Sequence, residues 1–176
     1  MGSPQSPAPL ADHSVLIAEA ELHRLMARHT RSAALCDRLE ACADALPTWP
    51  VEDEAERLRS ALNDFIGHDG PSTADLAEML RPGLPDVLTA ALLRHVEARR
   101  TEDLVHAGDL MAVLDAAPAE LGRISADTLG YMLRCFFAAR RQMMAFEMLA
   151  VLMLGQHRLT ADGRSLLIDG LCRRAA

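Results

Sequence analysis

Residues 125–154, SADTLGYMLRCFFAARRQMMAFEMLAVLML, carry a helical pattern that decides the fold class. Ser125 can cap a helix N-terminus, and Asp127 and Thr128 follow in the first turn. Side chains then recur at three- and four-residue intervals, which places them on one face of a helix. That face runs through Leu129, Leu133, Phe136, Met143, Glu147, Ala150 and Leu154. The stretch therefore predicts an amphipathic helix, with one acidic residue on its apolar face.

The rest of the chain has the same helical pattern, interrupted by segments that contain Pro and Gly. A first helix is expected over residues 12–46, and a second begins at the acidic segment 52–54. A short helix up to residue 80, a long one over 86–115 and a last one over 160–173 complete the pattern. Long helices joined by short loops pack best as an antiparallel bundle. The sequence thus predicts an all-α, antiparallel four-helix up-down bundle with an additional C-terminal helix.

Composition supports this fold class. Half of the 176 residues are apolar, which is enough for one continuous core, whereas aromatic residues make up only 3%. Ala, Leu and Met favour helices, and strands favour the aromatic and β-branched residues that are scarce here. We expect residues 1–11 to form a disordered lead and residues 12–176 to form one helical domain.

Charge and hydropathy argue against two classes of partner. The net charge is −7 at pH 7, and the arginines do not cluster into the basic stripe that nucleic-acid binding requires. No apolar run is long enough to span a membrane. Cys36, Cys42 and Cys135 lie within apolar helical patterns, where a free thiol behaves as a small buried hydrophobe, and no C-x-x-C pair occurs. A reducing cytoplasm is the simplest setting for such a chain.

Polar residues interrupt the apolar face of every long helix. These residues are His29, His68, His95, Glu102, His106 and Glu147. Glu102 and His106 are four residues apart, so they share a helix face and could chelate one ion. Imidazole and carboxylate groups suit iron or another transition metal, and bundle interiors commonly house such sites. The set is a candidate metal site in the core.

The same residues have a structural interpretation. A His on an apolar face is usually hydrogen-bonded to a neighbour within the core. A buried carboxylate needs a partner, and Glu147 could pair with Arg99, Arg140 or a buried His. Both interpretations place a polar cluster inside the bundle.

Several short motifs resemble the bacterial hemerythrin-like (HHE cation-binding) family. They are RHTR at 28–31 with LCDRLE at 35–40, DFIGHD at 64–69, LLRH at 92–95, LGYMLR at 129–134 with FF at 136–137, AFE at 145–147 and RLT at 158–160. The similarity spans residues 25–166. It implies a four-helix bundle that carries a two-iron, oxygen-related site, with His29, His68, His95 and Glu147 as ligands. Glu102 and His106 are added from helical spacing and are not family positions.

The chain departs from the family at three ligand positions. After His68 the family continues with an H-x-x-x-E element, whereas residues 69–75 here are DGPSTAD. Arg99 stands four residues after His95, and Met143 stands four residues before Glu147, where the family has ligands. A guanidinium cannot coordinate a metal, and a thioether is a poor ligand for ferric iron. The resemblance therefore implies a diverged member without the full two-metal site, in which an Arg replaces the metal's charge.

Three functions remain open at this point. The chain is a binding or regulatory module with a small ligand or a polar network in its core, or a metalloprotein that senses or stores oxygen or metal. Alternatively, it is a helical interaction protein, for instance a homodimer through the Met- and Phe-rich segment 125–154. No residue pair is recognisable as a catalytic acid, base or nucleophile. Enzymatic activity is therefore the less favoured expectation.

Overall fold

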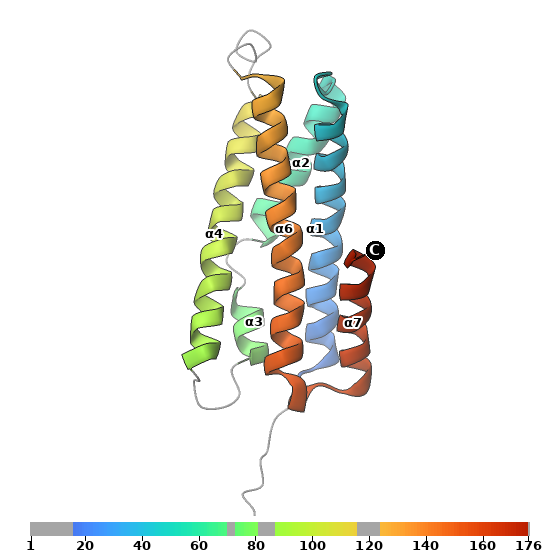
Figure 1. Cartoon of the computed structure of the whole chain (residues 1–176), viewed down its shortest axis with the longest axis vertical. Coiled ribbons are helices and arrows are strands. Elements are labelled where there is room, and N and C mark those ends of the chain that lie inside the picture. The colour runs from blue at the N-terminus through green and yellow to red at the C-terminus, as the bar shows by residue number, and fades with distance from the viewer. Residues whose placement is uncertain (1–15, 70–72, 81–86, 116–123, 176) are drawn as a thin grey trace, which may run out of the picture.

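The computed structural model describes residues 16–69, 73–80, 87–115 and 124–175, and every regular element in these ranges is a helix. The elements are α1 (Glu19–Ala45), α2 (Glu52–Asp69), α3 (Thr73–Leu80), α4 (Val87–Asp115), α6 (Ala126–Leu154), the 3₁₀ turn η1 (Gln156–Arg158) and α7 (Ala161–Ala175). The long helices run along the longest axis of the molecule (Figure 1). The predicted all-α class is confirmed for the described part of the chain.

Helix ends follow the signals in the sequence. The Ser125 hydroxyl accepts a hydrogen bond from the Thr128 N–H at 3.1 Å, which is the predicted N-cap of α6. At the other end of α6, the Gly155 N–H donates to the Val151 carbonyl. α1 begins at Glu19 rather than near residue 12, because Ala18 has an extended backbone. The predicted lead at residues 1–11 lies outside the described residues.

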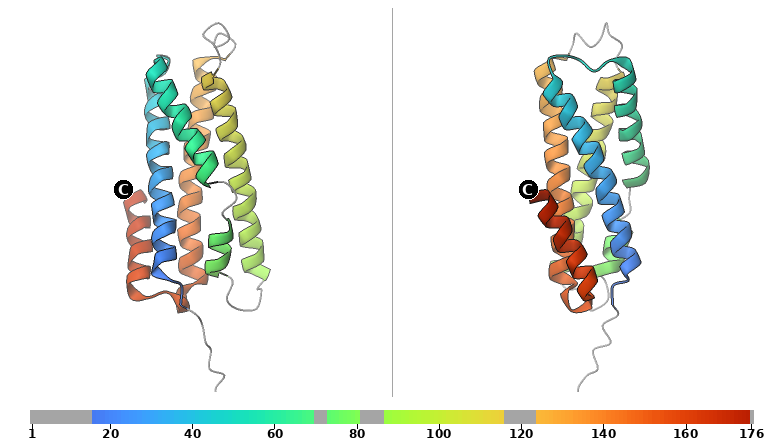
Figure 2. Two further views of the ribbon diagram at one scale, coloured as in Figure 1. Left: turned by 180° about the vertical axis from the view of Figure 1, so that it is seen from behind. Right: turned by 90° about the vertical axis from the view of Figure 1, so that its right-hand side faces the viewer.

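The helices contact one another in a closed ring. α1 and α4 each pack against α6, and α2 packs against both α1 and α4. α3 follows α2 along the same side of the molecule and contacts α4 and α6 (Figure 2). α7 returns along the outside of α1 and α6. The described chain is thus a helical bundle, and its members enclose one elongated core.

The core contains two hydrophobic clusters at different heights of the bundle. One includes Leu39, Leu62, Leu110 and Phe136, and the other includes Leu25, Val96, Met148 and Leu167. Each large apolar side chain that is fully buried contributes roughly 1.5–3 kcal/mol to folding. The two clusters contain residues from different parts of α1, α4 and α6. A stretch of each of these helices therefore lies between the clusters.

Two glycines bring α7 close to α1. A Cβ atom added at Gly163 would lie 2.7 Å from Leu22 Cδ1, and one added at Gly170 would lie 2.6 Å from Met26 Cε. Both distances are shorter than real Cβ atoms show, so at these positions the backbone of α7 lies directly against side chains of α1. Leu167, on the same face of α7, is fully buried against α6 and α1.

The structure also bears on two smaller expectations. Within the described ranges, no helix is both long and apolar enough to cross a membrane. Cys36 and Cys42 are buried as predicted, but Cys135 is exposed. The prediction for Cys135 was wrong because this residue shares the outer face of α6 with Tyr131, which is 71% exposed.

We expect Ser125→Ala to lower the free energy of unfolding by about 1 kcal/mol, because the Thr128 N–H loses its acceptor. Ser125→Asp keeps an acceptor and adds a negative charge at the helix N-terminus, so its stability should stay near that of the unmodified chain. Urea denaturation followed by far-ultraviolet circular dichroism measures both. Equal losses in the two variants would contradict the capping role.

Candidate functional site

Polar and charged side chains lie inside the bundle between the two hydrophobic clusters. They come from the middle of α1, α4 and α6, and together they form what we call the polar layer: Arg28, His29, Ser32, Arg100, Asp103, Arg140 and Glu147. All seven are buried. On α1 and α4 they are flanked on both sides by apolar core residues of the two clusters. Buried charges persist in proteins only when they are paired, so the layer should be closely bonded.

Glu147 is the centre of the polar layer and is fully buried. Its Oε2 accepts a hydrogen bond from His29 Nε2 at 2.9 Å, and its Oε1 accepts two from Arg100, from Nη2 at 3.1 Å and Nε at 3.2 Å. A carboxylate only accepts, so the proton lies on Nε2 of His29. One carboxylate on α6 thereby joins α1 and α4.

The electrostatics of Glu147 follow from these bonds. Burial alone would raise its pKa, because it disfavours the charged form. The hydrogen bond from His29 and the charge of Arg100 outweigh burial and lower the pKa from 4.5 to about 2. Glu147 is therefore ionised at neutral pH, and its negative charge is held by the protein's own groups.

Arg140 forms the second part of the polar layer. Its Nη2 donates to Ser32 Oγ at 3.1 Å, and its Nη1 lies 3.5 Å from Asp103 Oδ2. The guanidinium carbon also lies 5.1 Å from the centre of the Phe65 ring, which is a cation–π distance. Burial raises the pKa of Asp103 despite the opposing charge of Arg140. Arg140 thus links α6 to α1, α2 and α4.

The structure brings together two of the residues predicted from the sequence, His29 and Glu147. His95 is exposed and packs its ring edge-to-face against Phe146 at 5.4 Å. Glu102 and His106 are also exposed, on the outer side of α4. His68 belongs to α2, but its side chain lies outside the described residues.

The predicted inner face of α4 was wrong by one residue. The residues expected inside were His95, Arg99, Glu102 and His106, whereas Val96, Arg100, Asp103 and Ala107 are buried. Arg99 lies on the outside, where it pairs with Glu102 at 2.6 Å. The reason is that apolar residues occur on several sides of α4, and two of its inward positions are charged. Hydrophobic pattern therefore does not define a single face.

An Arg does pair with Glu147, but it is Arg100 and not Arg99. Met143, the other residue expected near the former ligand positions, is buried in a hydrophobic cluster. The candidate site predicted from the sequence did not include Arg28, Ser32, Arg100 or Asp103, and Arg140 was one of the partners predicted for Glu147. One signal could have found the α4 residues. Val96, Arg100, Asp103, Ala107, Leu110 and Leu114 repeat at three- and four-residue intervals, as a single helix face requires.

The donor set of the polar layer does not fit a pair of iron ions. Among the described residues, no three His, Cys, Asp or Glu side chains converge as a metal site would need. His29 and Glu147 are bonded to each other, and Arg100 occupies the second oxygen of Glu147. A guanidinium is always cationic and has no lone pair to give a metal. The Arg100 guanidinium thus lies against Glu147, where the resemblance implies metal charge.

We expect Glu147→Gln to lower the free energy of unfolding by about 3–5 kcal/mol, because it leaves Arg100 buried without a counter-charge. Arg100→Met combined with Glu147→Gln removes both charges and should recover most of the loss. Glu102→Gln is the matched control, since it breaks an ion pair of the neighbouring Arg99 on the surface and should cost about 0–1 kcal/mol. Chemical denaturation measures all three. Equal losses of unfolding free energy in Glu147→Gln and Glu102→Gln would contradict the placement of Glu147 in a buried ion pair.

The stabilisation from Glu147 should depend on pH with a defined sign. Its folded pKa of about 2 lies below its ordinary value of 4.5, so its contribution is complete above pH 4.5 and is lost as the pH falls through 2. The shift corresponds to about 3 kcal/mol. Asp103 acts in the opposite direction because its pKa is raised. Comparing the unmodified chain with Glu147→Gln isolates Glu147, and the difference in unfolding free energy should shrink over this range. A difference that stays constant with pH would contradict the lowered pKa of Glu147.

Comparison with known proteins finds no relative of this chain. No protein-family model, curated protein or solved structure matches the chain. The hemerythrin-like resemblance therefore rests on the short motifs of the sequence. The chemistry of the site rests on its own geometry, namely a carboxylate held by an imidazole and a guanidinium in a dry core.

Proposed function

We propose that the chain is a diverged hemerythrin-like domain that works as a binding or regulatory module, with the polar layer in place of a two-metal centre. In this proposal α1, α2 with α3, α4 and α6 form an antiparallel four-helix up-down bundle, and α7 is the additional helix. The closed ring of contacts among these helices supports the arrangement. So does the short connection between α1 and α2, which favours antiparallel neighbours.

One observation carries the proposal: Arg100 donates two hydrogen bonds to Glu147, the carboxylate that the resemblance implies as a ligand. Both side chains are buried, so water does not weaken the pair. A metal ion at Glu147 would have to displace the guanidinium and the His29 hydrogen bond, and it would then lie close to a positive charge. The fixed cation supplies the neutralisation that a metal would otherwise provide.

The alternative function, a metalloprotein for oxygen or metal, is favoured by a different observation. His29 and Glu147 are both buried and lie within 2.9 Å of each other, and each is a ligand type for iron or another transition metal. A mononuclear site would need further donors besides these two. The two proposals therefore differ in whether Glu147 remains bound to Arg100 when metal is offered.

Metal analysis separates the two functions. The full chain, purified without chelators or a metal-affinity step, should contain almost no transition metal, and anaerobic loading with ferrous iron should not change that. The reason is that Arg100 and His29 already occupy both oxygens of Glu147. About two iron ions per chain with an oxo-bridge absorption band would overturn the metal-free function.

A designed variant tests the scaffold itself. Arg100→Glu with Met143→His removes the cation and places two donors beside His29 and Glu147. If the resemblance to the metal-binding family is correct, this double variant should take up iron where the unmodified chain does not. Glu102→Gln with Met143→His is the control, since it adds the same imidazole and keeps Arg100. Equal iron uptake by the two variants would argue against a role for Arg100 in keeping metal out.

A further inference from the structure

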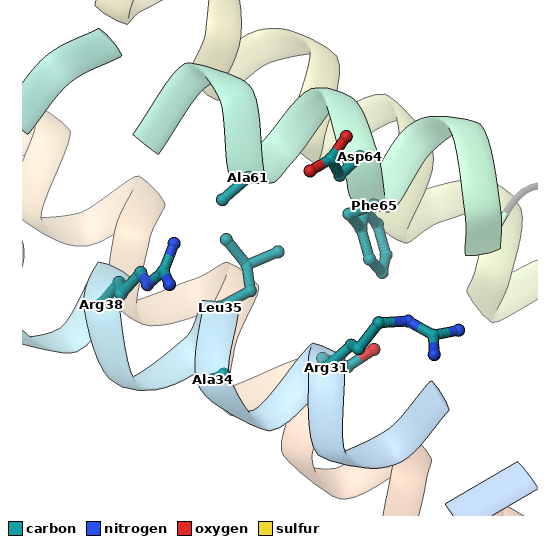
Figure 3. A pocket seen from close by; sticks show the side chains of 8 residues that line it. Arg31, Ala34, Leu35, Arg38, Ala61, Asp64 and Phe65 are labelled. Atoms are coloured by element: carbon teal, nitrogen blue, oxygen red, sulfur yellow. The ribbon is translucent and has the colours of Figure 1, made fainter. Parts of the chain in front are cut away.

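A pocket opens between α1 and α2 beside the polar layer (Figure 3). Its volume is about 490 Å³, which lies within the range of small-molecule sites. The residues that line it are Arg31, Ser32, Ala34, Leu35, Arg38, Ala61, Asp64 and Phe65. No step of the function proposed above uses this pocket, so its chemistry is considered separately.

The inner wall of the pocket is apolar and partly aromatic. Leu35 and Phe65 belong to a hydrophobic cluster, and each exposes less than a tenth of its surface. Ala61 on α2 lies opposite Leu35 on α1 and is small, which leaves space between the two helices (Figure 3). Ser32 is also buried and adds a hydroxyl group. A flat aromatic group could cover this wall and pack against the Phe65 ring.

The rim of the pocket carries two arginines from α1. Arg31 and Arg38 are exposed and seven residues apart, so they share a helix face and are separated by about 10 Å along the axis. Figure 3 shows them on either side of Leu35. Within the described ranges, neither guanidinium takes part in a hydrogen bond or ion pair. Asp64 on α2 is the acidic residue of the lining. The rim is therefore positive overall.

A third positive group lies directly behind the wall. Arg140 is 3% exposed, donates to Ser32 Oγ at 3.1 Å and lies 5.1 Å from the Phe65 ring centre. Two residues of the pocket wall thus touch the same buried cation. In a poorly solvated site, a charge at this depth acts over a longer range than it does in water. The pocket combines an apolar wall with a positive rim, and the Arg140–Asp103 pair lies behind the wall.

We propose that this pocket binds a small organic anion with an aromatic body, such as an aryl carboxylate. The aromatic body would lie on Leu35, Ala61 and Phe65, and the carboxylate would pair with Arg31 or Arg38. Inorganic phosphate fits less well, because it would leave the apolar wall uncovered. This inference rests on the proposed binding function and names its ligand class.

Calorimetric titration of the full chain with naphthoate tests the proposal, and naphthamide serves as a neutral analogue of the same shape. Naphthoate should bind at least about tenfold more tightly than naphthamide, since a charge-assisted contact is worth that much or more. Inorganic phosphate should bind more weakly than naphthoate. Naphthoate binding should weaken with salt because the arginines of the rim are exposed.

Four variants locate the site. Arg31→Gln with Arg38→Gln should weaken naphthoate binding by about tenfold or more without unfolding the chain, because both side chains are exposed. Arg24→Gln, an exposed Arg of α1 outside the pocket, is the matched control and should change nothing. Ala61→Phe fills the pocket and should abolish binding. Asp64→Asn removes a negative charge from the rim and should tighten naphthoate binding a few-fold, with no effect on naphthamide.

Three results would contradict the proposed ligand class. Absence of naphthoate binding at millimolar concentration, equal binding of naphthamide or phosphate, or unchanged binding by the double Arg variant would each overturn the ligand class. Circular dichroism of Ala61→Phe checks its fold, and the two surface Arg substitutions decide the matter if that variant unfolds. Iron uptake would overturn the metal-free function without affecting this titration, so the two failures are distinguishable.

Discussion

The carboxylate of Glu147 binds His29 on α1 and Arg100 on α4 at once, and the positions of three helices depend on this arrangement. Apolar contacts are not directional, and two helices can slide by a turn while they still bury similar areas. Hydrogen bonds to a buried charge do not permit such a slide, because a displaced helix would leave the charge without a partner. Glu147 therefore fixes the relative heights of α1, α4 and α6 more strictly than the hydrophobic clusters can.

This constraint explains why charge lies in the middle of the core. Replacing a buried ion pair by apolar residues is often neutral or stabilising, so the pair does not exist to increase stability. Its value lies in the penalty that it imposes on alternative packings, and this penalty grows with the depth of burial. The surface pair of Arg99 and Glu102, one residue away along α4, has half-exposed partners and imposes no such penalty. The Arg100–Glu147 and Arg99–Glu102 pairs consist of the same residue types and differ in their position in the bundle.

The sequence predicts the helices well and the polar layer only in part. Capping and breaking signals are local, so Ser125, Gly155 and the acidic start of α2 locate helix ends without knowledge of the fold. His29 and Glu147 could be found because each interrupts an otherwise apolar face. Arg100 and Asp103 could not be chosen over Arg99 and Glu102 by residue type, since both pairs place an Arg and an acid three residues apart. The apolar residues that share a helix face with Arg100 and Asp103 favour this pair, and the packing of α4 against α6 buries it. The pocket could not be predicted from the sequence either, because it depends on how α2 lies against α1.

Arg140 connects the polar layer to the pocket. It touches Ser32 and Phe65, which form part of the pocket wall, and its other side faces Asp103 on α4. A ligand that restricts the Phe65 ring or the Ser32 hydroxyl therefore acts on Arg140 directly, with no longer chain of contacts needed. Because a ligand that binds only the folded chain stabilises it by mass action, occupancy of the pocket also stabilises the helix heights that Glu147 sets. Arg140 thus lies between the proposed pocket on α1 and α2 and Asp103 on α4.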